Sequence, residues 1–125
     1  MIAADSSTWV AFIEGENGSD IQLLAEALRD QQVLMPPAAL SELLSDPKLP
    51  EEVESILAGI PLIEIEEGYW QRVGALRAKV LRKNRRARLG DALIAQSCLD
   101  RGIALITRDR DFRVFGDAAG LELLL

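Results

Sequence analysis

Carboxylate side chains carry most of the chemistry that this sequence allows. They lie at separate places in the chain: Asp5, Glu42, Asp91, Asp109 and Asp111. Converging carboxylates repel one another unless a cation is bound between them. Oxygen ligands of this kind suit hard divalent cations. If the fold brings these acids together, they predict a site for Mg²⁺ or Mn²⁺.

The rest of the composition removes the common alternatives. The chain contains no histidine and a single cysteine, Cys98, so it has neither a Ser-His-Asp nor a Cys-His catalytic set. The usual zinc ligands are missing for the same reason. Cys98 falls among apolar residues of a predicted helix, which indicates a buried structural thiol.

Positive charge is concentrated in one segment of an otherwise acidic chain. The net charge is −6, yet no acid occurs between Glu67 and Asp91. This interval holds eight of the fourteen basic residues: Arg72, Arg77, Lys79, Arg82, Lys83, Arg85, Arg86 and Arg88. Such a segment predicts contact with a polyanion. The alternative is a solvated helix face.

Short apolar segments alternate with amphipathic ones along the chain. We expect strands at 1–4, 33–35, 62–65 and 103–106, with a fifth edge strand at 120–124. Helices are expected at 9–13 (with Ser6 or Ser7 near the start), 20–28, 37–44, 50–58, 66–83 and 92–100, and the segment 112–115 is either a helical turn or a strand. This alternation predicts one α/β domain over residues 1–125, with a four- to five-stranded, mainly parallel sheet flanked by helices on both faces.

Such a sheet places ligand sites at the carboxyl ends of its strands. Asp5 and Asp109 each follow a strand, Asp91 opens a helix, and Glu42 lies about two turns into another. Each acid also has a simpler explanation. Asp5 and Asp91 fit helix caps, Glu42 fits a solvent-facing position, and the last two acids fit a turn.

No apolar run approaches the roughly 20 residues that a membrane span needs. The first residues lack the basic and apolar regions of a signal peptide. We therefore expect a cytoplasmic protein that does not contact a membrane.

Four stretches together resemble the PIN-domain ribonucleases, and most of all the VapC-type toxins of bacterial and archaeal toxin–antitoxin pairs. They are Asp5-Ser6-Ser7, Leu40-Ser41-Glu42-Leu43, Gly90-Asp91-Ala92-Leu93-Ile94-Ala95 and Leu105-Ile106-Thr107-Arg108-Asp109-Arg110-Asp111-Phe112. They occur in the family's order and cover essentially the whole chain. The resemblance implies a PIN-like three-layer fold and Mg²⁺- or Mn²⁺-dependent endoribonuclease activity.

The resemblance also assigns roles to residues. It implies that Asp5, Glu42, Asp91 and Asp109 form the catalytic, metal-binding set, with Asp111 as the alternative fourth acid. Ser6 (or Ser7) and Thr107 correspond to supporting hydroxyl residues. Five arginines near these acids are expected to hold the RNA backbone: Arg85, Arg86, Arg88, Arg108 and Arg110.

Expected partners are an RNA substrate and a small cognate antitoxin, in a homodimer or a toxin–antitoxin hetero-oligomer. Two other readings compete. An Asp-nucleophile phosphatase or a receiver domain also uses acids at strand ends, but the former would need Asp-x-Asp where the chain has Asp5-Ser6-Ser7. The second alternative is a non-catalytic, RNA- or protein-binding PIN-like module.

Overall fold

The computed structural model describes residues 1–124 of the chain. Its elements, in order, are β1 (Ile2–Ala4), α1 (Ser6–Ile13), α2 (Ser19–Arg29), α3 (Pro37–Leu44), α4 (Glu51–Ala58), α5 (Tyr69–Arg82), α6 (Leu89–Arg101), β2 (Ala104–Ile106), the 3-10 helix η1 (Arg110–Phe112), α7 (Arg113–Ala119) and β3 (Leu123–Leu124). Within this part of the chain, no helix has the length and apolar character that crossing a membrane requires.

The strands form a parallel sheet in the order β1–β2–β3. Ala4 is in register with Ile106, and Leu105 with Leu123. Two further extended segments continue this arrangement beyond β1 through isolated parallel bridges, Ile2 with Val33 and Met35 with Leu62. The α/β class and the parallel sheet are therefore confirmed.

The segments 33–35 and 62–65 were expected to be strands, but each forms only bridges. Prolines explain the interruption. Pro36 and Pro37 follow the first segment, and Pro61 precedes the second. A proline has no backbone N–H to donate to a neighbouring strand, so the ladder of hydrogen bonds stops there.

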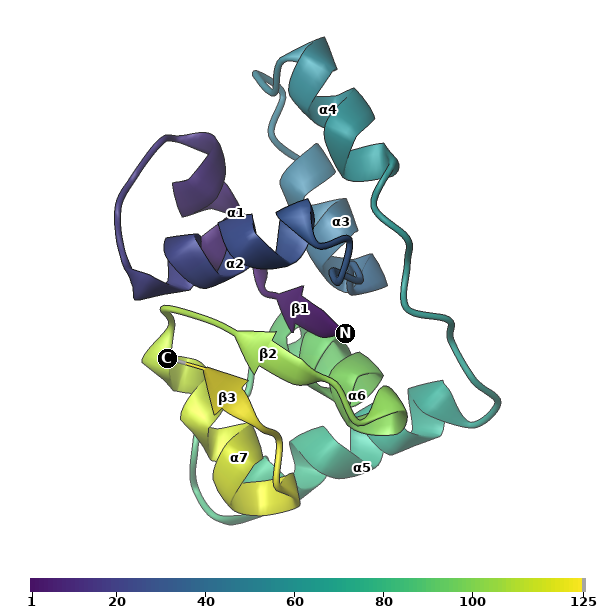
Figure 1. Ribbon diagram of the computed structural model, residues 1–125. Helices are drawn as coiled ribbons and strands as arrows, with labels where there is room; N and C mark the ends of the chain where they lie inside the picture. Colours follow the sequence, from purple (N-terminus) through teal and green to yellow (C-terminus); the bar gives the residue numbers. More distant parts are fainter. Residues whose placement is uncertain (125) are drawn as a thin grey trace.

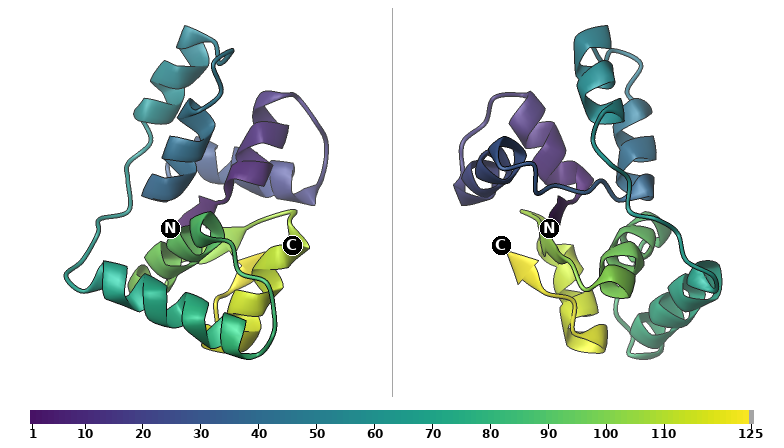
Figure 2. Two further views of the ribbon diagram at one scale, coloured as in Figure 1. Left: turned by 180° about the vertical axis from the view of Figure 1, so that it is seen from behind. Right: turned by 45° about the vertical axis from the view of Figure 1, so that its right-hand side comes forward.

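Helices cover both faces of the sheet (Figure 1). α1 and α2 lie on one side, whereas α5, α6 and α7 lie on the other, as the turned views in Figure 2 also show. α3 contacts both α1 and α6, so it joins the two layers. The α3–α4 pair extends away from the sheet. This is the three-layer arrangement that the sequence predicts.

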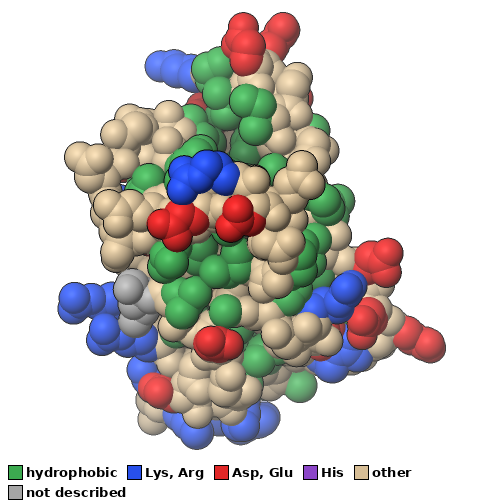
Figure 3. Space-filling view, viewed as in Figure 1, with side chains coloured by type: hydrophobic (Ala, Val, Ile, Leu, Met, Phe, Trp, Pro, Cys, Tyr) green, Lys and Arg blue, Asp and Glu red, His purple; other side chains and the backbone are tan. Residues whose placement is uncertain are grey.

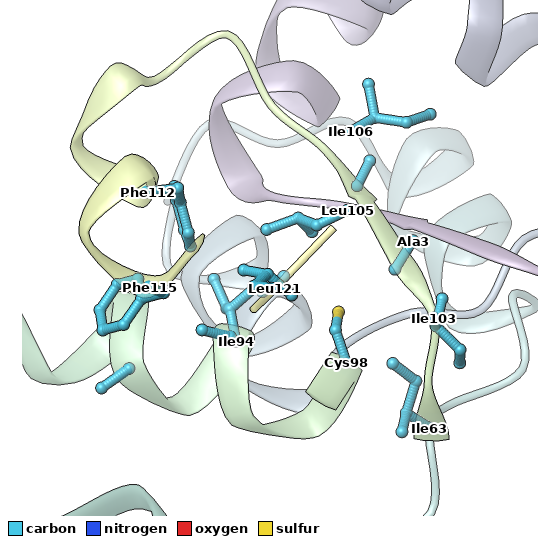
Figure 4. Packing of buried hydrophobic residues seen from close by; sticks show 14 of the residues in the cluster. Ala3, Ile63, Ile94, Cys98, Ile103, Leu105, Ile106, Phe112, Phe115 and Leu121 are labelled. Carbon is cyan, nitrogen blue, oxygen red and sulfur yellow. The ribbon is translucent and has the colours of Figure 1, made fainter. Parts of the chain in front are cut away.

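The core lies between the sheet and α6 and α7. Figure 4 shows Ile94 and Cys98 of α6 among the side chains of the strands, with Phe112 and Phe115 grouped nearby. Cys98 is buried, and burial raises the pKa of its thiol to about 12. The cysteine is therefore an apolar core residue, as expected, and not a thiolate nucleophile.

Two helices, α5 and α6, begin three residues away from the expected positions. α5 begins at Tyr69, because Gly68 before it has a φ of 84° and interrupts the helical backbone. The acids at 66 and 67 therefore precede the helix. α6 begins at Leu89, with Arg88 at the N-cap position. Asp91 consequently lies in the first turn of α6, where its charge still complements the helix dipole.

Candidate functional site

The carboxylate of Asp5 lies at the carboxyl end of β1 and is almost completely buried, with 2% of the residue exposed. The residue also caps α1, since its Oδ1 accepts a hydrogen bond of 3.1 Å from the Thr8 N–H. Ser7 Oγ lies 2.9 Å from Oδ1 and 2.8 Å from Oδ2. Thr107 Oγ1 donates to Oδ2 at 2.9 Å. The capping role and a role in the site are thus compatible.

Burial raises the pKa of Asp5, while the hydrogen bonds from Ser7, Thr8 and Thr107 act in the opposite direction. These donors stabilise the charged form of a carboxylate that the core would otherwise disfavour. They also fix its orientation. The Asp5 carboxyl group is therefore held in a fixed position at the end of the central strands by these hydrogen bonds.

Glu42 approaches this region from α3. Ser6 Oγ donates to Glu42 Oε1 at 2.6 Å, across 36 positions in the sequence. The other oxygen faces the start of α6, where a Cβ built on Gly90 would lie 3.3 Å from Glu42 Oε2. The glycine therefore leaves the space that this carboxylate occupies. The two serines after Asp5 therefore contact different acids: Ser7 contacts Asp5, and Ser6 contacts Glu42.

Asp109 lies beyond β2 and caps η1, with its Oδ1 accepting from the Asp111 N–H at 2.9 Å. Its own N–H donates to Thr107 Oγ1, also at 2.9 Å. The Thr107 hydroxyl, which is fully buried, thus joins the backbone of Asp109 to the side chain of Asp5. One hydroxyl group therefore fixes the spacing between two of the acids.

The charges of the three other expected acids all affect the pKa of Asp91. Its pKa is raised to about 6, mainly by burial and then by the negative charges of Asp109 and Glu42; Arg88 opposes the shift, and Asp5 adds the smallest contribution. Charges affect each other to this extent only at short range. The fold therefore brings the four acids to one edge of the sheet.

These acids do not form a preorganised cage. Among residues 1–124, no group of three or more Asp, Glu or Cys side chains is arranged so that it could hold a metal ion as it stands. The donor set nevertheless fits Mg²⁺ or Mn²⁺ chemically. Every available donor is a hard oxygen, and Mg²⁺ is usually held by one or two carboxylates with water and substrate phosphate completing its shell.

A basic cavity opens beside Asp91. Its volume is about 470 Å³, and Asp91, Asp111, Arg77, Arg85, Arg86 and Arg88 are among its lining residues. Arg77 Nε donates to the Ala87 carbonyl at 2.7 Å and so holds the connection between α5 and α6 in place. Arg85 pairs with Asp117 at 2.9 Å. Positive and negative side chains thus meet at one opening.

The arginines after β2 differ in their surroundings. Arg110 and Arg113 are exposed and line a second cavity of about 510 Å³ next to Thr107. Arg108 lines it too, but its guanidinium is engaged by Asp20. Figure 3 shows Lys and Arg side chains gathered at the lower left and bottom of the viewed face, around α7.

Sequence reasoning missed Thr8, Asp20 and Gly90. Thr8 contacts Asp20 across 12 positions of the sequence, and Asp20 contacts Arg108 across 88 positions. No local sequence pattern predicts these contacts. Gly90 offered a weak signal, because a glycine in the first turn of a helix lowers helix propensity and so requires a reason.

The chain was compared with protein-family models, curated proteins and solved structures. The model of the PIN domain family matches residues 2–118. A comparison with curated protein sequences found no match. Among solved structures, VapBC2 from Rickettsia felis bound to a promoter DNA fragment matches with a TM-score of 0.78 and 20% identity, covering 99% of this chain and 98% of that one.

Two other solved structures are similar in the same way. DNA-bound VapBC from Salmonella typhimurium gives a TM-score of 0.74 at 19% identity, with 99% and 98% of the two chains covered. FitAcB from Neisseria gonorrhoeae gives 0.72 at 15% identity, with 100% and 97% covered. At these identities the likeness establishes the fold.

Proposed function

This chain belongs to the PIN domain family, and we propose that it is a metal-dependent endoribonuclease that acts as the toxin of a type II toxin–antitoxin pair. The observation that carries the proposal is the grouping of the acids: Thr107 joins Asp5 to Asp109, and Glu42 lies against Gly90, next to Asp91. In agreement, burial and then the neighbouring carboxylates raise the pKa of Asp91 to about 6. Like charges grouped in this way repel one another. A bound cation would relieve this repulsion, and the four acids would then form a metal site.

In the proposed site Asp5, Asp91 and Asp109 hold Mg²⁺ or Mn²⁺, directly or through water, and Glu42 orients the attacking water. Asp109 is preferred to Asp111 as the fourth acid, because its charge has the largest effect of the three other carboxylates on the pKa of Asp91 and because Thr107 joins it to Asp5. Asp111 lines the cavity beside Asp91. Glu42 is exposed and can turn inward.

The ion, when bound, lowers the pKa of water and stabilises negative charge on the phosphate oxygens. The protein contributes the geometry. Thr107 and Ser7 fix Asp5, and Ser6 holds one oxygen of Glu42 so that the other faces the site. Hydrolysis on this plan leaves a 5′-phosphate and a 3′-hydroxyl.

The substrate is proposed to be RNA, held by phosphate contacts from Arg85, Arg86, Arg88 and Arg110. Arg85, Arg86 and Arg88 line the same cavity as Asp91, which supports an RNA strand running past these arginines to the acids. A single domain over residues 1–125, acting in the cytoplasm, is part of the same proposal.

A cognate antitoxin is proposed as the protein partner, in a hetero-oligomer or alongside a homodimer of this chain. The support is the likeness to VapBC from Rickettsia felis and Salmonella typhimurium over almost the whole of each chain. A partner that inhibits by charge would contact the arginines that we assign to RNA or the acids that we assign to the metal ion.

The test compares the wild-type protein with Asp5→Asn in RNA cleavage with Mn²⁺. We expect cleavage by the wild type and a loss of at least about 100-fold in the variant, because Asp5 is the most firmly held acid. Growth arrest on expression in bacteria should depend on the same residue. Equal cleavage by both proteins would contradict the acidic site, and RNA binding without cleavage by either would favour a non-catalytic module.

A further inference from the structure

The loop after β2 is tied to the start of α2 by an ion pair between Arg108 and Asp20. Arg108 Nε lies 2.8 Å from Asp20 Oδ2, and Nη2 lies 2.9 Å from Oδ1. Both carboxylate oxygens are therefore engaged in a two-point contact, which fixes angle as well as distance. The Asp20 side chain is 7% exposed and that of Arg108 is 32% exposed.

This ion pair continues into the acidic site through two threonines. Thr8 Oγ1 donates to Asp20 Oδ2 at 3.2 Å, and the N–H of the same residue donates to Asp5 Oδ1 at 3.1 Å. On the other side Arg108 directly follows Thr107, which donates to Asp5 Oδ2 at 2.9 Å. The contacts thus close a ring, and each oxygen of Asp5 receives a hydrogen bond from one arm of it.

The chain around Asp20 is shaped to admit the arginine. Gly18 has a φ of 149°, and a Cβ placed there would lie 2.6 Å from Asp20 Oδ1 and 3.1 Å from Arg108 Nη2. Any side chain at this position would collide with the ion pair, and the backbone angle itself favours glycine. Arg108 Nη2 also donates to the Asn17 carbonyl at 3.2 Å.

We infer that the Asp20–Arg108 ion pair is a positioning device for the acidic site, and that Arg108 serves the reaction through Asp5 and Asp109 rather than by contacting RNA. The sequence alone pointed to an RNA contact. Its guanidinium is already matched by a buried carboxylate, so little of its charge remains for a phosphate. The inference rests on the proposed function, since it concerns how the proposed ligands are held.

The geometry explains why this position matters. Arg108 lies between Thr107 and Asp109 in the chain, so fixing its side chain fixes the backbone on which both neighbours depend. Groups that orient metal ligands typically alter metal affinity or activity by 10- to 100-fold when they are removed. A contact to a phosphate would instead alter the binding of RNA and its dependence on salt.

The test is a set of variants studied in the full chain: Asp20→Ala, Arg108→Ala, the double variant, and Arg108→Lys. We measure Mn²⁺ affinity without RNA, then kcat and KM for cleavage. We expect each single variant to lose about tenfold in Mn²⁺ affinity and in kcat, with KM changed by less than about threefold. The double variant should be no worse than either single variant, because both act through one contact. Arg108→Lys should recover part of the loss.

Arg72→Ala is the matched control. It removes another two-point ion pair, in which Arg72 Nε and Nη2 lie 2.9 and 2.7 Å from the two Asp100 oxygens. Asp100 lies nine positions after Asp91 on α6, about 13 Å along the helix axis. This control should lower stability and leave Mn²⁺ affinity unchanged, so it separates positioning from general loosening of the fold.

A single variant can unfold if it leaves a buried charge unpaired. In that case Mn²⁺ affinity, kcat and KM are measured on the double variant, which removes both charges of the ion pair. Two results together would overturn the inference: a raised KM with normal Mn²⁺ affinity for Arg108→Ala, and an Asp20→Ala variant that behaves like the wild-type protein. They would indicate that Arg108 contacts RNA directly. A wild-type protein that neither binds Mn²⁺ nor cleaves RNA would instead refute the proposed function, and the inference with it.

Discussion

Thr107 Oγ1 donates a 2.9 Å hydrogen bond to Asp5 Oδ2 across 102 positions of the sequence. The same oxygen accepts from the Asp109 N–H, so a single buried hydroxyl connects the ends of two neighbouring parallel strands. The contact is available only because Ala4 and Ile106 are in register in the sheet. The predictions that follow use this and related contacts to separate the role of each group.

Thr107→Val keeps the shape of the side chain and removes the hydroxyl. We expect about a tenfold loss of Mn²⁺ affinity and a similar loss of cleavage, because Asp5 loses one of its orienting donors. Thr107→Ser retains the hydroxyl and should behave nearly like the wild type. Isothermal titration with Mn²⁺ measures the effect. Equal affinities for the Val and Ser variants would contradict a positioning role for this hydroxyl.

Gly90→Ala is expected to separate stability from activity. Alanine favours the helix by about 0.5 kcal/mol or more over glycine, and Glu42 is exposed and can move away. Its Oε2 would have to give way to a Cβ at 3.3 Å, so cleavage should fall. Gly74→Ala in α5, where a Cβ would meet nothing within 4 Å, serves as the control, with added stability and unchanged cleavage. Chemical denaturation and a cleavage assay read the two effects.

Asp91→Asn should stabilise the metal-free protein above pH 6. The pKa of Asp91 is about 6 in the fold and near 4 when unfolded, so the unfolded chain loses this proton first as pH rises. Stability is therefore lost between about pH 4 and 6 and does not return at higher pH. The shift corresponds to about 3 kcal/mol at most, and partial exposure reduces this to on the order of 1 kcal/mol.

The measurement is denaturation of the wild type and Asp91→Asn in a chelator, at pH 4 and pH 8. The two proteins should differ more at pH 8. Adding Mn²⁺ should reverse the order by stabilising the wild type alone. A variant that is less stable than the wild type at pH 8 without metal would show that the carboxylates do not repel one another in this way.

The Arg72–Asp100 pair should act in the opposite pH direction. The hydrogen bonds from Arg72 hold the pKa of Asp100 below its usual range. Its contribution is therefore present above the unfolded pKa near 4 and is lost as pH falls through the folded value. We expect Asp100→Asn to unfold at lower denaturant concentration than the wild type at pH 7, with the difference shrinking below pH 4. A difference that is constant from pH 7 to pH 3 would exclude this ion pair as its source.

Arg86→Ala is expected to raise the KM for RNA several-fold while kcat changes little, since this exposed arginine lines the cavity beside Asp91. Loss of one phosphate contact to a single strand should also lower the slope of log affinity against log salt by about 0.7. Arg29→Ala provides the control, because Arg29 ends α2 three residues before Gln32, whose carbonyl accepts from the Ile2 N–H at the opposite end of β1 from Asp5. An unchanged salt slope for Arg86→Ala would remove Arg86 from the RNA path.

The sequence by itself determined the class of fold and supplied the candidate acids. Apolar runs separated by amphipathic segments have the periods of strands and helices, and these periods are local properties. The absence of histidine left carboxylates as the available chemistry. Because parallel strands expose their carboxyl ends at one edge, acids that follow strands were bound to meet there. Asp5 and Asp109 were predictable for this reason.

The tertiary structure decided which of these groups contact one another. Two expected strands form only isolated bridges, because prolines interrupt their hydrogen bonding. Arg108 was indistinguishable from Arg110 in the sequence, yet only Arg108 meets Asp20, a residue 88 positions away. Likewise, nothing local ties Ser6 to Glu42 or Thr107 to Asp5. Such contacts depend on how distant segments pack, so a sequence pattern supplies the candidate residues and the folded chain assigns their partners.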